Sequence, residues 1–184
     1  LGDTICASHT ITFIAAKPGL LTGDGPDHSG EIRVANLELK PEINQQPDGK
    51  LLTLTDFSAH LKARLKNSHK GSFGSLGILG GAPSMTGAAF LAGRAALMLG
   101  AGRVYLGLVD SHAPAFDPLQ PELMLRHAQS LLQTKLDAMA CGPGLGVSLQ
   151  ASEMLECAVD LDLPLVLDAD ALNLIASEGN LQVA

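Results

Sequence analysis

Residues 75–109 read SLGILG-GAPSM-TGAAFLAGRAALMLG-AG-RVYLGLV, and this stretch decides the fold. The short apolar run from Ser75 to Gly80 predicts a strand that enters a Gly-Gly turn. Thr86 to Gly100 has the length and composition of a helix, with Gly102 as its stop. Arg103 to Val109 then predicts a second strand. A strand, a helix and a strand at these lengths indicate a βαβ unit in a parallel α/β sheet covered on both faces.

The same alternation continues toward the end of the chain. Ala138 to Cys141 predicts a strand, and Ser148 is placed to cap a helix that runs to about Leu161. Pro164 to Leu167 predicts a further strand, and Ala171 to Ser177 a further helix. A sheet that stopped there would leave an unpaired edge and bare apolar faces. We therefore expect the domain to continue beyond Ala184.

The beginning of the chain has a different pattern. Thr10 to Ile14 and Glu31 to Leu37 predict two short strands separated by turn residues. Two strands cannot build an independent core, so this segment is expected to pack either on a part of the protein outside this sequence or on the rest of this chain. Because the sequence begins at Leu1 in the middle of a pattern, we also expect it to be a fragment.

A polar stretch rich in Pro, Asn and Gln, Lys40 to Lys50, predicts a linker between domains. Thr55 and Asp56 are predicted to cap a short helix that reaches about Lys66. We therefore expect three parts, which are a remnant of a first domain at 1–39, a linker at 40–54 and an incomplete α/β domain at 55–184.

Composition and charge exclude several classes of protein. The net charge of -7 and the lack of a Lys/Arg cluster argue against a nucleic-acid partner. The longest weakly polar run, residues 86–102, is interrupted by Arg94 and is too short for a membrane helix, so no membrane partner is expected. Cys6, Cys141 and Cys157 form no CxxC motif, which indicates reduced thiols in the cytoplasm and neither a disulfide framework nor a metal site.

The Gly-Gly turn after the first of these strands opens a helix with small residues, Gly87, Ala88 and Ala89. A helix N-terminus offers free N–H groups and partial positive charge, so a phosphate group can lie there, close to the backbone. The alternative is that small residues only let the helix pack tightly on the sheet. The motif is neither a Walker A loop nor a dinucleotide fingerprint.

The segment Cys141-Gly142-Pro143-Gly144-Leu145-Gly146 follows a strand directly. Open α/β sheets bind ligands at the carboxyl ends of their strands, and alternating glycines there can form a nest of backbone N–H groups for an anion. The alternative is an ordinary glycine-rich turn. Cys141 is interpreted as a small buried hydrophobe and not as a nucleophile.

Two acidic residues end the strand before the last predicted helix, in the segment LVLDADALNL at 165–174. A carboxylate at this edge can orient a ligand hydroxyl or hold Mg²⁺ through water. The alternative is capping of the helix that follows. We favour a site role for Asp168 and a capping role for Asp170.

Lys70 stands in the segment SHKGSFG at 68–74, before the first strand of the sheet, where it can reach a phosphate. The alternative is a solvated lysine in an entry loop. His112 and His127 have no companions at metal-ligand spacing and are assigned to the surface or to loops.

These segments, taken in order, resemble the NAD(P)H-hydrate dehydratase family, which has a doubly wound, ribokinase-like α/β fold. The motifs that carry the resemblance are His69-Lys70-Gly71-x-Phe73-Gly74, Gly80-Gly81-x-x-x-Met85-x-Gly87-Ala88-Ala89-x-Leu91-Ala92, Arg94-Ala95-Ala96-Leu97-x-x-Gly100-Ala101-Gly102, Pro121-Glu122-Leu123-Met124, Gly142-Pro143-Gly144-Leu145-Gly146 and Asp168-Ala169-Asp170-Ala171-Leu172-Asn173. Ser72 and Ser75 depart from the acidic and basic residues that are common there.

The first segment resembles the end of an NAD(P)H-hydrate epimerase domain, through Thr10 to Phe13, Lys17-Pro18-Gly19-Leu20-Leu21-Thr22-Gly23 and Gly30-Glu31. Bacterial members of the family often fuse an epimerase to a dehydratase in this order. The two resemblances together imply a single bifunctional repair protein.

The resemblance implies removal of water from the (6S) hydrate of NADH or NADPH, with ADP or ATP and Mg²⁺ as co-substrate. It also implies epimerisation of the (6R) form by the intact protein, which would need K⁺ in the missing part of the epimerase site, and assembly into a homo-oligomer. The fragment alone is expected to be inactive, because no catalytic residue is assigned in it. The alternatives are a small-molecule kinase of the ribokinase superfamily and a nucleotide-binding module without catalysis.

Carried over by position, the resemblance assigns a substrate site and a nucleotide contact. The substrate site comprises Gly87, Ala88, Ala89, Gly142, Gly144, Gly146, Asp168 and Asn173. Lys70 is assigned to the nucleotide.

Overall fold

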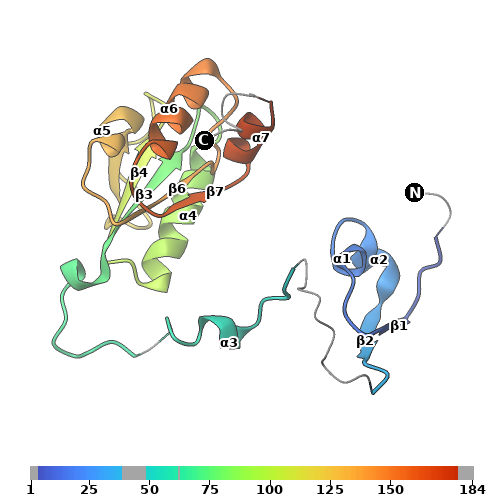
Figure 1. The fold of residues 1–184 in the computed structure, drawn as a ribbon. Helices are drawn as coiled ribbons and strands as arrows, with labels where there is room; N and C mark the ends of the chain where they lie inside the picture. The colour runs from blue at the N-terminus through green and yellow to red at the C-terminus, as the bar shows by residue number, and fades with distance from the viewer. Residues whose placement is uncertain (1–3, 39–48, 62, 178–184) are drawn as a thin grey trace. The chain divides into compact units, whose positions relative to one another are not determined.

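The computed structural model describes residues 4–38, 49–61 and 63–177 (Figure 1). The chain divides into two compact units, Leu1–Ala63 and Arg64–Ala184. Residues 40–48 of the expected linker lie outside the described residues, so the domain limits stay predictions. Among the described residues, no helix is long and apolar enough to cross a membrane.

The second unit contains a five-stranded sheet in which every neighbouring pair is parallel. Its strand order is β5-β4-β3-β6-β7, with β3 in the centre. The strands are β3 (Ser75–Gly80), β4 (Arg103–Leu108), β5 (Met124–His127), β6 (Ala138–Cys141) and β7 (Leu165–Leu167). The predicted parallel α/β sheet is confirmed, and the predicted bounds of β3 and β6 agree with the structure.

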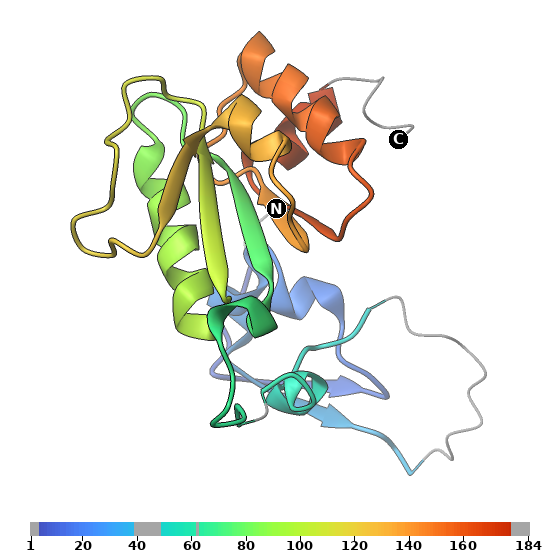
Figure 2. The same cartoon turned by 90° about the vertical axis from the view of Figure 1, so that its left-hand side faces the viewer.

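Helices cover both faces of this sheet (Figure 2). The helix α4 (Thr86–Leu99) packs on one face, against Ile78 and Leu106. The other face carries α5 (Ala128–Leu132), α6 (Leu149–Val159) and α7 (Asp170–Ser177), over Leu79 and Met139. Successive residues of a strand point to opposite faces, so β3 supplies both cores and reads as one continuous apolar run.

Two helix ends test the sequence analysis closely. The Ser148 hydroxyl accepts a hydrogen bond from the Ala151 N–H at 3.2 Å, which confirms the predicted cap of α6. The predicted helix from Thr86 to Gly100 is confirmed as α4, but the glycine that ends it is Gly100 and not Gly102. The helix ends at Gly100, where φ is 102° and the N–H donates to the carbonyl of Ala96 at 3.0 Å, so glycine closes the helix in the left-handed region.

The sequence analysis did not predict β5, α5 or the short 3₁₀ helix η1 (Lys70–Phe73). The strand β5 is a four-residue edge strand that ends in Arg126 and His127. Exposed charged residues are typical of edge strands, and they remove the apolar run by which a strand is recognised. This short strand has no apolar run of its own to identify it and is held in the sheet by pairing with β4.

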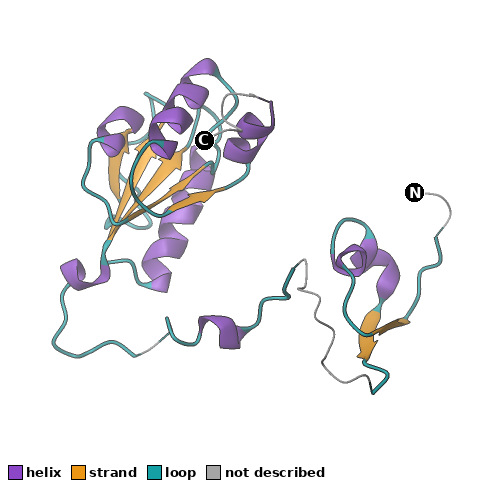
Figure 3. Cartoon of the chain, viewed as in Figure 1, coloured by secondary structure: helices purple, strands orange, loops and turns teal. Residues whose placement is uncertain are grey.

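The first unit is built around a parallel pair of strands, β1 (His9–Phe13) and β2 (Glu31–Ala35), seen in Figure 3. Two short helices, α1 (Pro18–Leu21) and α2 (Gly25–Ser29), connect them. Both predicted strands are confirmed, although β1 begins and ends one residue earlier than predicted and β2 ends two residues earlier. Beyond β1, Ile14 has a φ of 72°, which an extended strand cannot contain.

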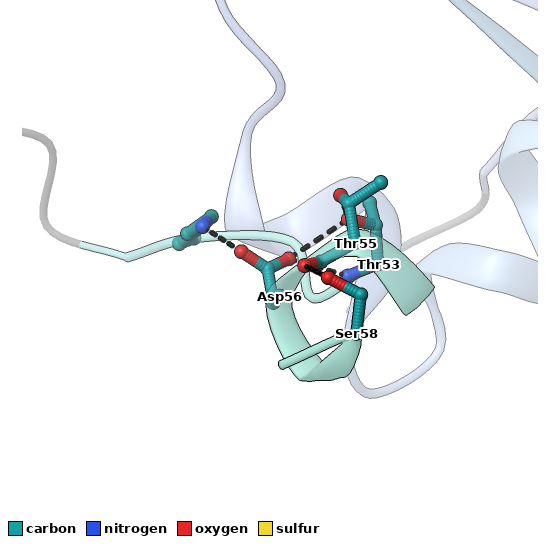
Figure 4. Close-up of polar contacts among 5 residues, drawn as sticks. Thr53, Thr55, Asp56 and Ser58 are labelled. Carbon is teal, nitrogen blue, oxygen red and sulfur yellow. Dashed lines mark hydrogen bonds and ion pairs between the residues drawn. The ribbon is translucent and has the colours of Figure 1, made fainter. Parts of the chain in front are cut away.

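The predicted helix from Thr55 to Lys66 is corrected by the structure. The helix α3 (Leu54–Phe57) is four residues long and begins after Thr53, which forms a capping box with Asp56 (Figure 4). The Asp56 carboxylate accepts a hydrogen bond from the Thr53 N–H at 2.8 Å and forms an ion pair with Lys50. Both contacts lower the pKa of the Asp56 carboxyl, and the one with Lys50 has the larger effect. The Ser58 hydroxyl bonds the Thr55 carbonyl at 2.9 Å, a local contact that competes with helix continuation.

The cap of α6 gives a stability prediction. Changing Ser148 to Ala leaves the Ala151 N–H without its side-chain acceptor, so the free energy of unfolding should fall by about 1 kcal/mol. Urea denaturation of the full-length protein measures this. Ser130→Ala, an exposed serine of α5, is the matched control and should change stability by less than about 0.5 kcal/mol. Equal effects of the two changes would contradict the capping role.

Candidate functional site at the carboxyl edge of the sheet

The turns that follow β3 and β6 are joined by backbone hydrogen bonds. The Gly81 N–H donates to the Pro143 carbonyl at 3.1 Å, and the Ala82 N–H donates to the Gly144 carbonyl at 2.6 Å. The Gly142 N–H in turn donates to the Leu79 carbonyl at 3.0 Å. The two glycine-rich motifs of the sequence, about 60 residues apart, therefore form one structural unit.

Glycine is required where these backbones meet. Gly142 has a φ of 130°, and a Cβ added there would lie 1.8 Å from the Asp168 carbonyl oxygen. Gly144 has a φ of 60°, and its Cβ would lie 2.5 Å from the Met85 carbonyl oxygen and 3.1 Å from the Ala88 Cβ. The loop after β6 thus touches both the turn after β7 and the first turn of α4.

The three small residues of α4 have different surroundings. Gly87 is exposed, and a Cβ added there would meet nothing within 4 Å. Ala88 is half-buried and faces Gly144. Ala89 is fully buried in the core beneath α4, so the packing alternative describes it. No side chain caps this end of α4, so open space adjoins an uncapped helix N-terminus at Gly87.

The two acidic residues that follow β7 also have different surroundings. Asp168 is exposed, and its backbone N–H donates to the Cys141 carbonyl at 3.0 Å. The Asp170 carboxylate accepts the Gly146 N–H at 2.8 Å. The expected capping role of Asp170 is therefore replaced by a bond to another loop, which ties Gly146 to α7. Asn173 is exposed in the second turn of α7.

Lys70 is not brought together with the other predicted site residues. It is exposed in η1, which precedes β3, while the glycine-rich turns follow β3. Six residues of strand at about 3.3 Å each separate these two edges by roughly 17–20 Å. Its assignment to the nucleotide stays a separate prediction.

The sequence analysis missed three polar residues at this edge. Asp110 follows β4, and its N–H donates to the Gly81 carbonyl at 3.0 Å. Arg126 and His127 end β5, and all three line one open pocket. A carboxylate directly after a strand was the available signal for Asp110. The other two depended on recognising β5, and His127, assigned to the surface, is exposed but borders this pocket.

The chemistry of this edge lies in backbone groups and space more than in reactive side chains. Burial raises the pKa of the Cys141 thiol to about 12, so it stays protonated, in agreement with the interpretation as a buried hydrophobe. Within the described ranges, no group of three or more His, Cys, Asp or Glu residues is placed to hold a metal ion. The edge can therefore bind and orient a ligand through N–H groups, small residues and the Asp168 carboxylate.

The sequence of this chain is similar to those of known proteins. Residues 76–183 match the family model described as NAD(P)H-hydrate dehydratase. The bifunctional NAD(P)H-hydrate repair enzyme Nnr of Coxiella burnetii is 37% identical over 182 residues, covering 95% of this chain and 37% of the relative. The ADP-dependent (S)-NAD(P)H-hydrate dehydratase of Neisseria meningitidis is 40% identical over 133 residues, covering 70% and 45%. The chain thus spans less than half the length of these curated relatives.

Solved structures give the same fold. A hypothetical protein of Streptococcus mutans aligns with a TM-score of 0.61 at 28% identity, covering 70% of this chain and 50% of that one. The ADP/ATP-dependent NAD(P)H-hydrate dehydratase of Bacillus subtilis, co-crystallised with ATP/Mg²⁺, aligns with a TM-score of 0.54 at 29% identity, covering 65% and 46%. A ribokinase-like superfamily protein of Enterococcus faecalis has the same TM-score, 0.54, at 27% identity, covering 64% and 44%. The second unit is therefore ribokinase-like.

The glycine contacts predict opposite effects of one chemical change at two positions. Gly142→Ala forces a Cβ into the Asp168 carbonyl and should lower the free energy of unfolding by about 2–4 kcal/mol. Gly87→Ala adds a methyl group to an open helix position and should raise it by about 0.5–1 kcal/mol. Chemical denaturation of both variants checks the pair, and a Gly142→Ala protein as stable as the wild type would refute the backbone contact.

Proposed function

The chain belongs to the NAD(P)H-hydrate dehydratase family, and on that premise we propose that the full-length protein dehydrates the (6S) hydrate of NADH or NADPH. The reaction uses ADP or ATP, with Mg²⁺, as co-substrate. The nucleotide phosphorylates the added hydroxyl, and phosphate then leaves. Since the chain covers only 37% of a bifunctional relative, this activity concerns the whole protein and not these residues alone.

The observation that carries the proposal is the uncapped start of α4, where Gly87 is exposed and has open space beside it. A Cβ on Gly144 would lie 3.1 Å from the Ala88 Cβ, so only small residues let the loop after β6 come this close to the first turn of α4. The N–H groups of the first turn favour phosphate oxygens, and the small residues let a flat nicotinamide ring approach the backbone. The shape of this site and its backbone N–H dipoles are the features that would hold a dinucleotide in one orientation.

The remaining site residues have supporting parts in this proposal. The Asp168 carboxylate, exposed at the same edge, would accept a hydrogen bond from a hydroxyl of the ligand. Gly142 and Gly146 shape the loop that presents Gly144, because one touches the Asp168 backbone and the other is held by Asp170. Asn173, exposed in α7, is assigned to the same substrate site. In this proposal the residues bind and orient the substrate, and none of them transfers a proton.

We also propose that residues 1–39 end an epimerase domain that acts on the (6R) form, with 40–54 as the linker and 55–184 in the dehydratase domain. Alignment of 95% of the chain with the bifunctional relative of Coxiella burnetii supports this. The parallel pair β1 and β2, joined by two short helices, suits the end of an α/β domain. The K⁺ ion of the epimerase site, the homo-oligomer and the cytoplasmic location belong to the same proposal.

A ribokinase-type kinase is the competing function, because it shares the fold. The two activities differ in product, since a kinase returns a stable phosphate ester and a dehydratase returns the reduced nucleotide and inorganic phosphate. The family match at 76–183 favours the dehydratase. Incubating the full-length protein with ADP or ATP and either hydrated NADH or free hydroxymethyl compounds separates them, and phosphorylation of the latter alone would overturn our proposal.

The close approach of Ala88 and Gly144 makes a specific prediction. Ala88→Leu should raise KM for hydrated NADH about tenfold, because the longer side chain pushes the Gly144 loop away from the start of α4. Ala95→Leu, at an exposed position of the same helix, should leave KM unchanged. Initial rates followed by the return of NADH absorbance measure both. An unaltered KM in Ala88→Leu would place the substrate elsewhere.

A further inference from the structure

An ion pair joins α4 to the loop that follows β4. Arg94 lies in the middle of α4, and its Nε and Nη2 atoms donate to the two Asp117 carboxylate oxygens at 2.7 and 2.8 Å. The Asp117 side chain is only 1% exposed, while that of Arg94 is 31% exposed. Such paired bonds fix the direction of both side chains as well as their distance.

Asp117 also organises the loop around itself. Its carboxylate accepts the Leu119 N–H at 3.0 Å, and its carbonyl accepts the Gln120 N–H at 3.2 Å. The hydrogen bond from Arg94 holds the pKa of the Asp117 carboxyl below its usual range. A buried carboxylate that lost its partner would be strongly destabilised, so the loop has one favourable position relative to α4.

This loop, residues 109–123, joins two parallel strands, and such a crossover commonly needs a dozen or more residues and usually contains a helix, whereas this one has none. Its start is fixed to the central strand, since the Val109 N–H donates to the Gly80 carbonyl at 2.9 Å. Its middle has the Arg94–Asp117 pair. A long loop that is fixed both at its start and in its middle has a defined conformation and can form the wall of a binding site.

The loop forms one wall of an open pocket of about 380 Å³. The apolar floor comes from Leu108 and Leu125, and the polar lining from Asp110, Arg126 and His127. Asp110 bonds the Gly81 backbone, so the pocket adjoins the turn that contacts the loop of Gly144. Neither Arg94 nor Asp117 lines the pocket, so both can act on it only through the loop.

We propose that this pocket is a subsite for the ribose-phosphate part of the hydrated dinucleotide, and that Arg94 and Asp117 are positioning residues that hold its wall. The inference rests on the proposed function. A carboxylate such as Asp110 suits ribose hydroxyls, and the Arg126 guanidinium and a ring N–H of His127 suit phosphate oxygens. The Asp110 N–H bonds the carbonyl of Gly81, in the turn that leads into α4, so one extended ligand can contact both the pocket and the start of that helix.

The first experiment weakens the pair without removing its charge. Lysine cannot donate two parallel bonds, so Arg94→Lys in the full-length protein should raise KM for hydrated NADH roughly tenfold, with kcat within about twofold of wild type. Hydrogen exchange of amides 110–119 should accelerate in the same variant. Arg103→Lys, the same change at the amino edge of the sheet, is the control and should alter neither quantity.

A second variant separates pocket occupancy from loop stability. Ala115 is exposed and lines the pocket, so Ala115→Phe should fill it and raise KM roughly tenfold while amide exchange stays as in wild type. An Arg94→Lys protein with a lower melting temperature but unchanged KM would make the pair merely structural and overturn the proposal. An unchanged KM in Ala115→Phe would remove the subsite.

Titration with NADPH keeps this test independent of the proposed function. Both variants should weaken NADPH binding roughly tenfold, since the ribose-phosphate groups are common to NADPH and its hydrate. If the wild-type protein turns over no hydrate, the proposed function fails, whereas the shift in Kd still supports the subsite. An NADPH Kd that is the same in all the proteins contradicts the subsite whatever the turnover.

Discussion

The carboxyl edge of the sheet depends on one physical constraint, the direct contact of backbone with backbone where β3, β6 and β7 end. A Cβ at Gly80 would lie 2.1 Å from the Pro143 carbonyl oxygen, and one at Gly142 would lie 1.8 Å from that of Asp168. No side chain fits between these segments. Because they touch, their N–H and carbonyl groups satisfy one another, and the turns form a rigid edge on which a ligand site can be built.

The same use of small residues explains how the helices approach the sheet. A Cβ at Gly107 of β4 would lie 2.6 Å from a methyl carbon of Leu131, and one at Gly93 of α4 would lie 2.8 Å from a methyl carbon of Leu106. Leucine methyl groups therefore fill the places where glycine has no side chain. A core packed in this way needs few large rings, in keeping with 20 glycines and only 3% aromatic residues.

The structure separates residues that the sequence motifs group together. Gly87 borders open space and Ala88 lies against the Gly144 loop, but Ala89 beside them belongs to the core. Asp168 is exposed at the edge, while Asp170 binds the Gly146 backbone. Each motif thus combines positions that hold the loops with positions that can meet a ligand. Mutations at the first kind change stability, and mutations at the second kind change binding.

The sequence alone determined the apolar elements bounded by glycine, such as β3 and β6, and the cap of α6 at Ser148. These features depend on residues within a few positions of one another, so pattern and propensity suffice. The tertiary structure alone decided the edge strand β5, the bond from Gly146 to Asp170 and the pair of Arg94 with Asp117. Their partners stand more than twenty residues apart or on another strand. Local propensity does not extend that far, and only packing of the whole sheet brings such groups within hydrogen-bonding distance.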